Sequence, residues 1–209
     1  MSNTILHIAN PPFKGSLDFD STDSRLLAIT KSKKTELLFV ALFIKLLKIG
    51  GRCASIVPDG VLFSTSNAHK KLRMELIENQ RLIAVVSMPA GIFQPYSGVK
   101  TSFIIFEKTN CCRTDKVWFY EMNGDGYSLD AKRTVDKSND DCSDVIYRFN
   151  HLKDEELRTR YDQSFLVPIN EIRDNDYDLT IKNYKKVKIE KTLHRPVTEI
   201  ISDINLVNE

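Results

Sequence analysis

The stretch Ile5-Leu6-His7-Ile8-Ala9-Asn10-Pro11-Pro12-Phe13 decides how the fold of this chain is interpreted. Its apolar half is typical of a strand, and its two prolines cannot continue a strand ladder, so it predicts a buried strand that ends in a rigid loop. In an open α/β sheet, ligands bind beyond the carboxyl ends of the strands. Residues 9–13 are therefore the first candidate for a ligand-binding loop.

This loop carries the groups needed to hold a flat heterocycle with an exocyclic amino group. The amide oxygen of Asn10 and the carbonyl of Pro11 can each accept one N–H, and Phe13 offers an aromatic face. Prolines 11 and 12 remove two donors and fix φ, which holds the acceptors in place. The same tetrapeptide is also typical of an ordinary proline-rich turn, so the loop alone leaves both interpretations open.

Helical patterns follow the loop. Thr35 can cap a helix over residues 36–49, which Gly50-Gly51 would end. Ser66 or Asn67 begins a second helix that extends to about residue 79. We expect the basic residues of this second helix on its outer surface, at His69, Lys70, Lys71 and Arg73.

Apolar runs separate these helices. Residues 53–57 and 82–88 are continuous apolar runs bounded by turn residues, as in strands that are covered on both faces. The resulting β-α-β-α-β order predicts a parallel sheet in which residues 53–57 lie beside 5–9. Residues 102–107 and 117–121 have no helix between them, so we expect an antiparallel hairpin at the sheet edge.

The chain becomes polar from about residue 130. A helix is expected over residues 144–160, followed by a charged segment. The composition elsewhere is ordinary, since 30 basic and 28 acidic residues give a net charge of +2, and any contact with nucleic acid must come from local patches. The apolar stretch 37–47 is too short for a membrane span and no secretory signal is visible, so we predict a cytoplasmic protein without a membrane contact.

The four cysteines do not predict a metal site. They lie at 53, 111, 112 and 142, without the paired spacing of a zinc centre and without a histidine cluster. We expect free thiols, with Cys53 as a small core residue in its strand.

Several pieces of the sequence match one known family in order and spacing. They lie at 9–15, 34–39, 50–52, 57–63, 93–102, 114–120, 125–130 and 175–179. Together they resemble the modification subunit of type I restriction–modification systems, and Asn10-Pro11-Pro12-Phe13 resembles the catalytic motif of amino-group DNA methyltransferases. The resemblance covers nearly all of the chain.

The resemblance implies a DNA methyltransferase that transfers a methyl group from S-adenosylmethionine to N6 of adenine. It assigns Asn10, Pro11, Pro12 and Phe13 to catalysis, with Asn10 also at the cofactor. Two carbonyl acceptors would favour an electron-rich amino nitrogen, which is positional and electrostatic catalysis, on a base extruded from the duplex. Phe13 would bind the target base together with one ring of the loop at 91–96. The sequence does not decide between Phe93 and Tyr96, and both rings are also compatible with simple core packing.

The cofactor half of the family pattern is missing from this chain. In the family, a glycine-rich turn that receives S-adenosylmethionine precedes the Asn-Pro-Pro-Phe motif. None of the eight glycines forms such a turn after a first strand, so we expect this chain alone to bind the cofactor weakly or not at all. The first strand would then form an exposed apolar edge that invites pairing with another chain.

The expected fold is therefore the carboxyl-terminal half of a class I, Rossmann-like α/β methyltransferase sheet, with parallel strands and an antiparallel edge hairpin. We expect a partial catalytic domain at residues 1–129 and a helical and irregular tail at 130–209.

Two functional hypotheses remain open. In the first, the chain is the catalytic-loop part of an adenine-N6 DNA methyltransferase, with DNA and the specificity and restriction subunits of the same system as partners. It would pair with a missing amino-terminal half or with itself. In the second, it is a catalytically inert remnant or assembly module that only contacts those subunits.

Overall fold

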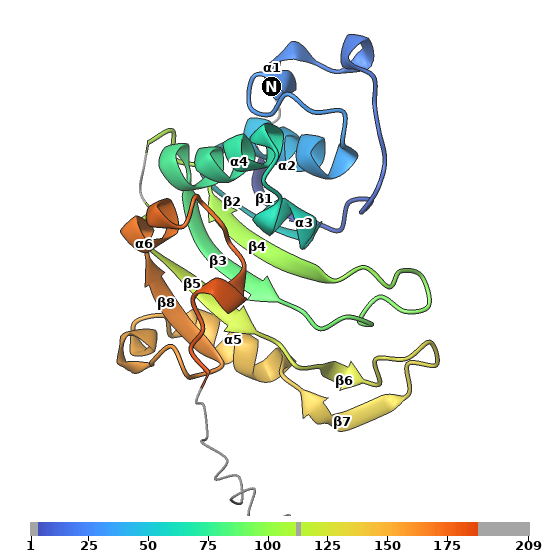
Figure 1. Cartoon of the computed structure of the whole chain (residues 1–209), viewed down its shortest axis with the longest axis vertical. Coiled ribbons are helices and arrows are strands. Elements are labelled where there is room, and N and C mark those ends of the chain that lie inside the picture. Colours follow the sequence, from blue (N-terminus) through green and yellow to red (C-terminus); the bar gives the residue numbers. More distant parts are fainter. Residues whose placement is uncertain (1–3, 112–113, 188–209) are drawn as a thin grey trace, which may run out of the picture.

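A six-stranded sheet runs through the computed structural model, which describes residues 4–111 and 114–187 (Figure 1). The strand order is β1-β2-β4-β3-β5-β8. The strands are β1 (Thr4–Ala9), β2 (Leu47–Pro58), β3 (Arg81–Ser87), β4 (Thr101–Glu107), β5 (Lys116–Glu121) and β8 (Ser164–Pro168). The mixed sheet with helices confirms the expected α/β class, and β2 lies beside β1 in parallel as expected.

The expected edge hairpin is wrong. β4 lies in the interior of the sheet, antiparallel to both β2 and β3. β5 does not pair with β4. It lies on the far side of β3, with which it pairs in parallel. Two strands without a helix between them are most simply paired with each other, but here β3, which precedes both in the sequence, lies between them.

Helices cover both faces of the sheet (Figure 1). On one face lie α2 (Thr35–Leu46), α3 (Gly60–Phe63) and α4 (Asn67–Met74), which continues into the π-helical η2 (Glu75–Asn79). α5 (Cys142–Asn150) packs against the other face. The remaining elements are η1 (Phe19–Ser21), α1 (Ser24–Leu27), β6 (Asp125–Tyr127), β7 (Val135–Asp140), η3 (Asp154–Leu157), α6 (Ile169–Asp174) and η4 (Ile181–Asn183).

The first predicted helix ends earlier than expected. α2 stops at Leu46, and Leu47 already lies opposite Thr4 in the ladder with β1. Gly50 therefore lies inside β2, where its φ of 80° and the bond from its N–H to the carbonyl of Lys108 mark an irregularity of the ladder. Thr35 begins α2, but no side chain caps this helix. Backbone pairing with neighbouring strands has overridden the local glycine signal.

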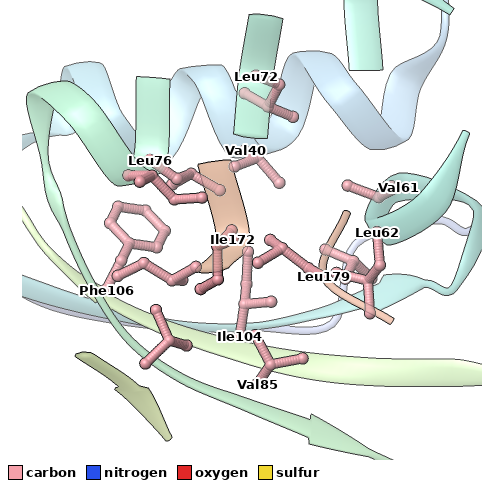
Figure 2. Packing of buried hydrophobic residues seen from close by; sticks show 14 of the residues in the cluster. Val40, Val61, Leu62, Leu72, Leu76, Val85, Ile104, Phe106, Ile172 and Leu179 are labelled. Atoms are coloured by element: carbon pink, nitrogen blue, oxygen red, sulfur yellow. The ribbon is translucent and has the colours of Figure 1, made fainter. Parts of the chain in front are cut away.

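The main core lies between the sheet and the α2–α4 layer (Figure 2). Val40 and Leu72 descend from the helices toward Ile104 of β4, and all three are buried. Fully burying such a side chain contributes roughly 1.5–3 kcal/mol. Ile172 and Leu179 enter the same core from the carboxyl-terminal segment.

Residues 130–187 contain more regular structure than expected. The predicted helix at 144–160 is shorter, as α5 followed by η3, because a turn at 151–153 separates them. β8 joins the main sheet against β5, with Phe165 and Val167 buried in the main core. The division into domains at residue 129 stays a prediction.

The expected basic surface of α4 is wrong for two of its residues. Arg73 is buried and donates to the carbonyls of Val61, Ser64 and Tyr177. His69 is also buried, which lowers its pKa to about 4, with smaller contributions from neighbouring cations. Arg73 thus attaches α4 to neighbouring segments, and neither side chain faces solvent.

Cys53 is a buried core residue, as expected, and its thiol is free, like those of Cys111 and Cys142. Cys112 lies outside the described residues. The described residues contain no group of three or more potential metal ligands. They also contain no helix that is long and apolar enough to cross a membrane.

A buried carboxylate joins the carboxyl-terminal segment to the sheet. Glu155 of η3 accepts hydrogen bonds from the indole Nε1 of Trp118 at 2.9 Å and from the hydroxyl of Ser164 at 2.7 Å. Arg148 of α5 donates to its other oxygen at 3.2 Å. One side chain thus connects β5, β8 and α5.

We predict that Glu155→Ala lowers the free energy of unfolding by roughly 2–4 kcal/mol, because it leaves two buried donors and a partly buried arginine without their acceptor. Urea denaturation would measure the change. The adjacent Glu156→Ala is the matched control, since Glu156 is exposed and pairs only with Lys116, which makes a loss of at most about 1 kcal/mol the expectation. Equal losses of stability from the two substitutions would contradict a stabilising role for the buried hydrogen bonds of Glu155.

Candidate functional site

The candidate catalytic loop leaves the sheet at the end of β1. Ala9, the last residue of β1, lies opposite Ser55 in the parallel ladder with β2, so the loop starts at the carboxyl edge where the sequence placed it. Pro11 is buried, Phe13 is half-buried, and Asn10 and Pro12 are exposed. The amide of Asn10 makes no hydrogen bond to any residue that the structure describes, so its oxygen is available as an acceptor.

A second aromatic ring meets this loop. The rings of Phe13 and Phe93 lie 5.2 Å apart between centroids, edge to face at 72°. Such aromatic pairs contribute about 0.5–1.5 kcal/mol beyond their burial. Tyr96, the alternative partner, is 94 % exposed. The structure therefore brings Phe93 beside Phe13 and leaves Tyr96 in solvent, while the functional roles of both rings stay predictions.

The loop that carries Phe93 is fixed at its exit by an acidic residue. Asp59, just beyond β2, accepts a hydrogen bond from Ser102 at 2.7 Å and lies 3.5 Å from the ammonium of Lys100. Its backbone N–H also donates to the carbonyl of Lys100. Asp59 was not singled out from the sequence, and only its position directly after a strand could have suggested this role.

The same loop is fixed at its base by close backbone packing. Gly91 has a φ of 99°, and an added Cβ would lie 2.2 Å from the carbonyl oxygen of Leu129. Leu129 belongs to the turn between β6 and β7, which form a separate two-stranded sheet. This hairpin extends alongside the Phe93 loop at the same end of the molecule (Figure 1).

An apolar pocket of about 320 Å³ adjoins Asn10 on the α5 side of β1 and β2. Its lining residues are Ile8, Ala9, Asn10, Ala54, Ser55, Ile56 and Phe103. S-adenosylmethionine needs a carboxylate for its ribose hydroxyls and a glycine-rich turn close to its backbone. The described lining provides neither, so these residues do not fit the complete group.

The expected exposed apolar edge is confirmed. β1 is an edge strand of the described sheet. Its side chains Ile5, Leu6 and Ile8 are 61 %, 57 % and 80 % exposed. An edge strand with large exposed aliphatic side chains on both faces is a template for pairing with another strand.

Comparisons with known proteins agree on one family. The model of the N-6 DNA methylase family matches residues 3–192. The methylase subunit of the type I restriction enzyme EcoEI from Escherichia coli is 32% identical over 177 residues, which are 84% of this chain and 35% of that subunit. The chain therefore spans about a third of the length of this curated relative.

Solved structures share the fold. A chain from a structural study of the assembly and conformational transition of the type I restriction–modification system has a TM-score of 0.70 and 28% identity, covering 99% of this chain and 43% of its own length. The EcoKI M protein has a TM-score of 0.67 and 21% identity, covering 99% of this chain and 48% of its own. The expected Rossmann-like methyltransferase fold is thereby confirmed.

We predict that Gly91→Ala destabilises the chain by more than about 1 kcal/mol and separates Phe93 from Phe13, because alanine disfavours this φ and its methyl group collides with Leu129. Thermal unfolding and ring-to-ring nuclear Overhauser effects would report both changes. Gly60→Ala is the control, since nothing lies within 4 Å of its added Cβ and its φ is not positive. A Gly91→Ala protein that keeps the wild-type stability and the contact between Phe93 and Phe13 would show that the packing of Gly91 against Leu129 does not exclude a side chain.

Proposed function

Because the chain belongs to the N-6 DNA methylase family, we propose that it is the catalytic-loop part of a DNA methyltransferase that acts on N6 of adenine within a type I restriction–modification system. The observation that carries this proposal is the Asn10–Phe13 loop at the carboxyl edge of β1, with Phe93 in contact with Phe13. The similarity to the EcoEI methylase subunit supports it.

Asn10 and Pro11 position the amino group in the proposed reaction. The free amide oxygen of Asn10 and the carbonyl of Pro11 each accept one N–H of the adenine, which favours a nitrogen with a localised lone pair. Pro12 is exposed and fixes the backbone between the acceptor and the aromatic ring. S-adenosylmethionine supplies the methyl group when it is bound, and its site requires residues beyond those that the structure describes.

Phe13 and Phe93 receive the extruded base. Rings that meet at 72° with centroids 5.2 Å apart leave no parallel slot between them, whereas a base sandwiched between two rings needs both planes parallel. We assign Phe93, rather than the exposed Tyr96, as the second base-binding ring because Phe93 already contacts Phe13. Since the two rings leave no parallel slot, Phe93 turns away from Phe13 when the base enters. The edge-to-face contact that is lost is replaced by stacking on the base.

The proposed partners follow from the family and from the exposed edge. DNA is the substrate, and the specificity and restriction subunits of the same system are the proposed protein partners, in the cytoplasm. The apolar edge of β1 pairs with a strand from the amino-terminal methylase segment, which supplies the cofactor site. In this proposal residues 1–129 form the partial catalytic domain and residues 130–209 form its carboxyl-terminal tail, of which β8 joins the main sheet.

A second candidate function is assembly without catalysis. The exposed side chains of β1 favour it, because they provide a docking surface whether or not a methyl group is transferred. The two functions differ in how they respond to changes at Asn10, which contributes nothing to a docking surface made by β1.

We predict that Asn10→Ala lowers methylation about 10²–10³-fold in an enzyme reconstituted with a cofactor-binding methylase segment, because one of two preorganised acceptors is lost. Phe13→Ala removes stacking worth roughly 1–3 kcal/mol per base, and DNA affinity falls accordingly. Transfer of labelled methyl groups to duplex DNA would measure activity, with melting temperature as the check on folding.

The controls for these two changes are Asn183→Ala, an exposed asparagine of η4, and Phe19→Ala in the long loop after the catalytic motif. Both should leave methylation unchanged. If Asn10→Ala assembles normally and methylates as well as the wild type, the catalytic proposal is wrong and the assembly function is favoured.

We predict that Ile8→Lys abolishes pairing with the amino-terminal methylase segment but leaves this chain folded, because Ile8 is 80 % exposed. Co-purification and analytical ultracentrifugation would detect the pairing. Leu157→Lys is the matched control, since Leu157 is equally exposed but belongs to η3. Unchanged pairing of Ile8→Lys would rule out β1 as the docking edge.

A further inference from the structure

A second cavity opens where Arg52, in the middle of β2, and Arg81, at the start of β3, face the end of α5. Its volume is about 560 Å³, within the range of 300–1,000 Å³ that is usual for small-molecule sites. Arg52 and Arg81 contribute one wall, and the end of α5 with the turn after it, including Lys153, contributes the other. We refer to it as the Arg52–Arg81 cavity.

The two arginines are aligned by a single carboxylate. Glu107 of β4 lies opposite Arg52 in the ladder with β2 and opposite Arg81 in the ladder with β3. Its Oε2 is 3.5 Å from Arg52 and 3.7 Å from Arg81. One negative charge is thus shared by two positive charges, which holds both guanidinium groups on the α5 side of the sheet.

The side-chain donors of these arginines form no hydrogen bonds among the residues that the structure describes. Several ion pairs elsewhere in the chain are short and hydrogen-bonded, such as Arg160 with Glu171 at 2.6 Å. The long contacts to Glu107 therefore align the guanidinium groups without saturating them.

The charge of the cavity is positive and its floor is apolar. Arg52, Arg81 and Lys153 outweigh Glu107 and Asp154 by one positive charge. The apolar part of the lining includes Ile83, which is buried, and Phe149, which is partly buried. A ligand that fits carries a compact anion next to an apolar or aromatic group.

We propose that the Arg52–Arg81 cavity binds a phosphate ester. Planar guanidinium groups with free donors match the oxygens of a phosphate in bidentate geometry, and a nearby ammonium adds a point charge. The aromatic ring of Phe149 offers a surface for a base. The phosphate comes either from a free nucleotide or from the backbone of a nucleic acid, and both share this chemistry. The cavity is separate from the candidate methylation site and does not depend on it.

Titration of the purified chain with inorganic phosphate, adenosine monophosphate and a short DNA duplex at low ionic strength tests the proposal. We expect at least one phosphate ester to bind. The double substitution Arg52→Gln/Arg81→Gln should lower its affinity about tenfold or more, because hydrogen bonds to a charged group are lost. If the ligand is a duplex, the slope of log K against log salt falls by about 2.

A second variant protects the test against misfolding. Lys153→Gln leaves the contacts of Glu107 intact and should weaken the same ligand by a smaller factor. Arg25→Gln is the control, because Arg25 is an exposed arginine paired only with Asp23. Binding of the monophosphate identifies a nucleotide site, and binding of the duplex alone identifies a backbone contact, both through the proposed arginines.

Absence of binding for all three ligands would overturn the proposal. The proposal would also be overturned if the double substitution and Lys153→Gln bind the ligand as tightly as Arg25→Gln does. The phosphate would then be held elsewhere. None of these measurements uses methylation, so a failure here is distinguishable from a failure of the methyltransferase proposal.

Discussion

Parallel pairing of β1 with β2 is the constraint on which the candidate site depends. Ala9 opposite Ser55 places the Asn10–Phe13 loop beside the end of β2. Interior placement of β4 completes the arrangement, because Thr101 lies opposite Pro58 and brings the exit of the Phe93 loop to the same edge. Backbone ladders thus bring together two rings from distant segments, and side chains such as Asp59 only fix the geometry that the ladders have set.

Local patterns predicted the elements of this fold well where one signal dominated. The apolar runs at 53–57 and 82–88 are strands, and the segment from Ser66 to about residue 79 is helical. The loop at Asn10–Phe13 also lies at the strand end where proline placed it. These features depend on neighbouring residues alone, so periodicity and turn chemistry suffice to recognise them.

The features that were missed are set by distant partners. Nothing near residues 101–107 indicates that β4 enters between β2 and β3, because this placement is decided by burial of Ile104 and Phe106 in the middle of the sheet. Arginine is a residue type that is usually exposed, yet three carbonyl acceptors from other segments make the burial of Arg73 favourable. Sequence alone likewise offered Phe93 and Tyr96 equally. The packing of Gly91 against Leu129 and the contacts of Asp59 fix the loop that brings Phe93 to Phe13.

Stability and catalytic completeness are separable in this molecule. The main core joins α2, α4 and β4 with Ile172 and Leu179 of the carboxyl-terminal segment, and it does not include the exposed side chains Ile5, Leu6 and Ile8 of β1. The described chain therefore encloses a core of its own while its first strand remains open to solvent. The side chains proposed for chemistry lie at that open edge, where Asn10 carries no packing and Ile8 has no neighbour on its exposed side. A partner that adds a strand to β1 would then complete the site without rebuilding the core, because the contacts it adds are those that the folded chain has left unused.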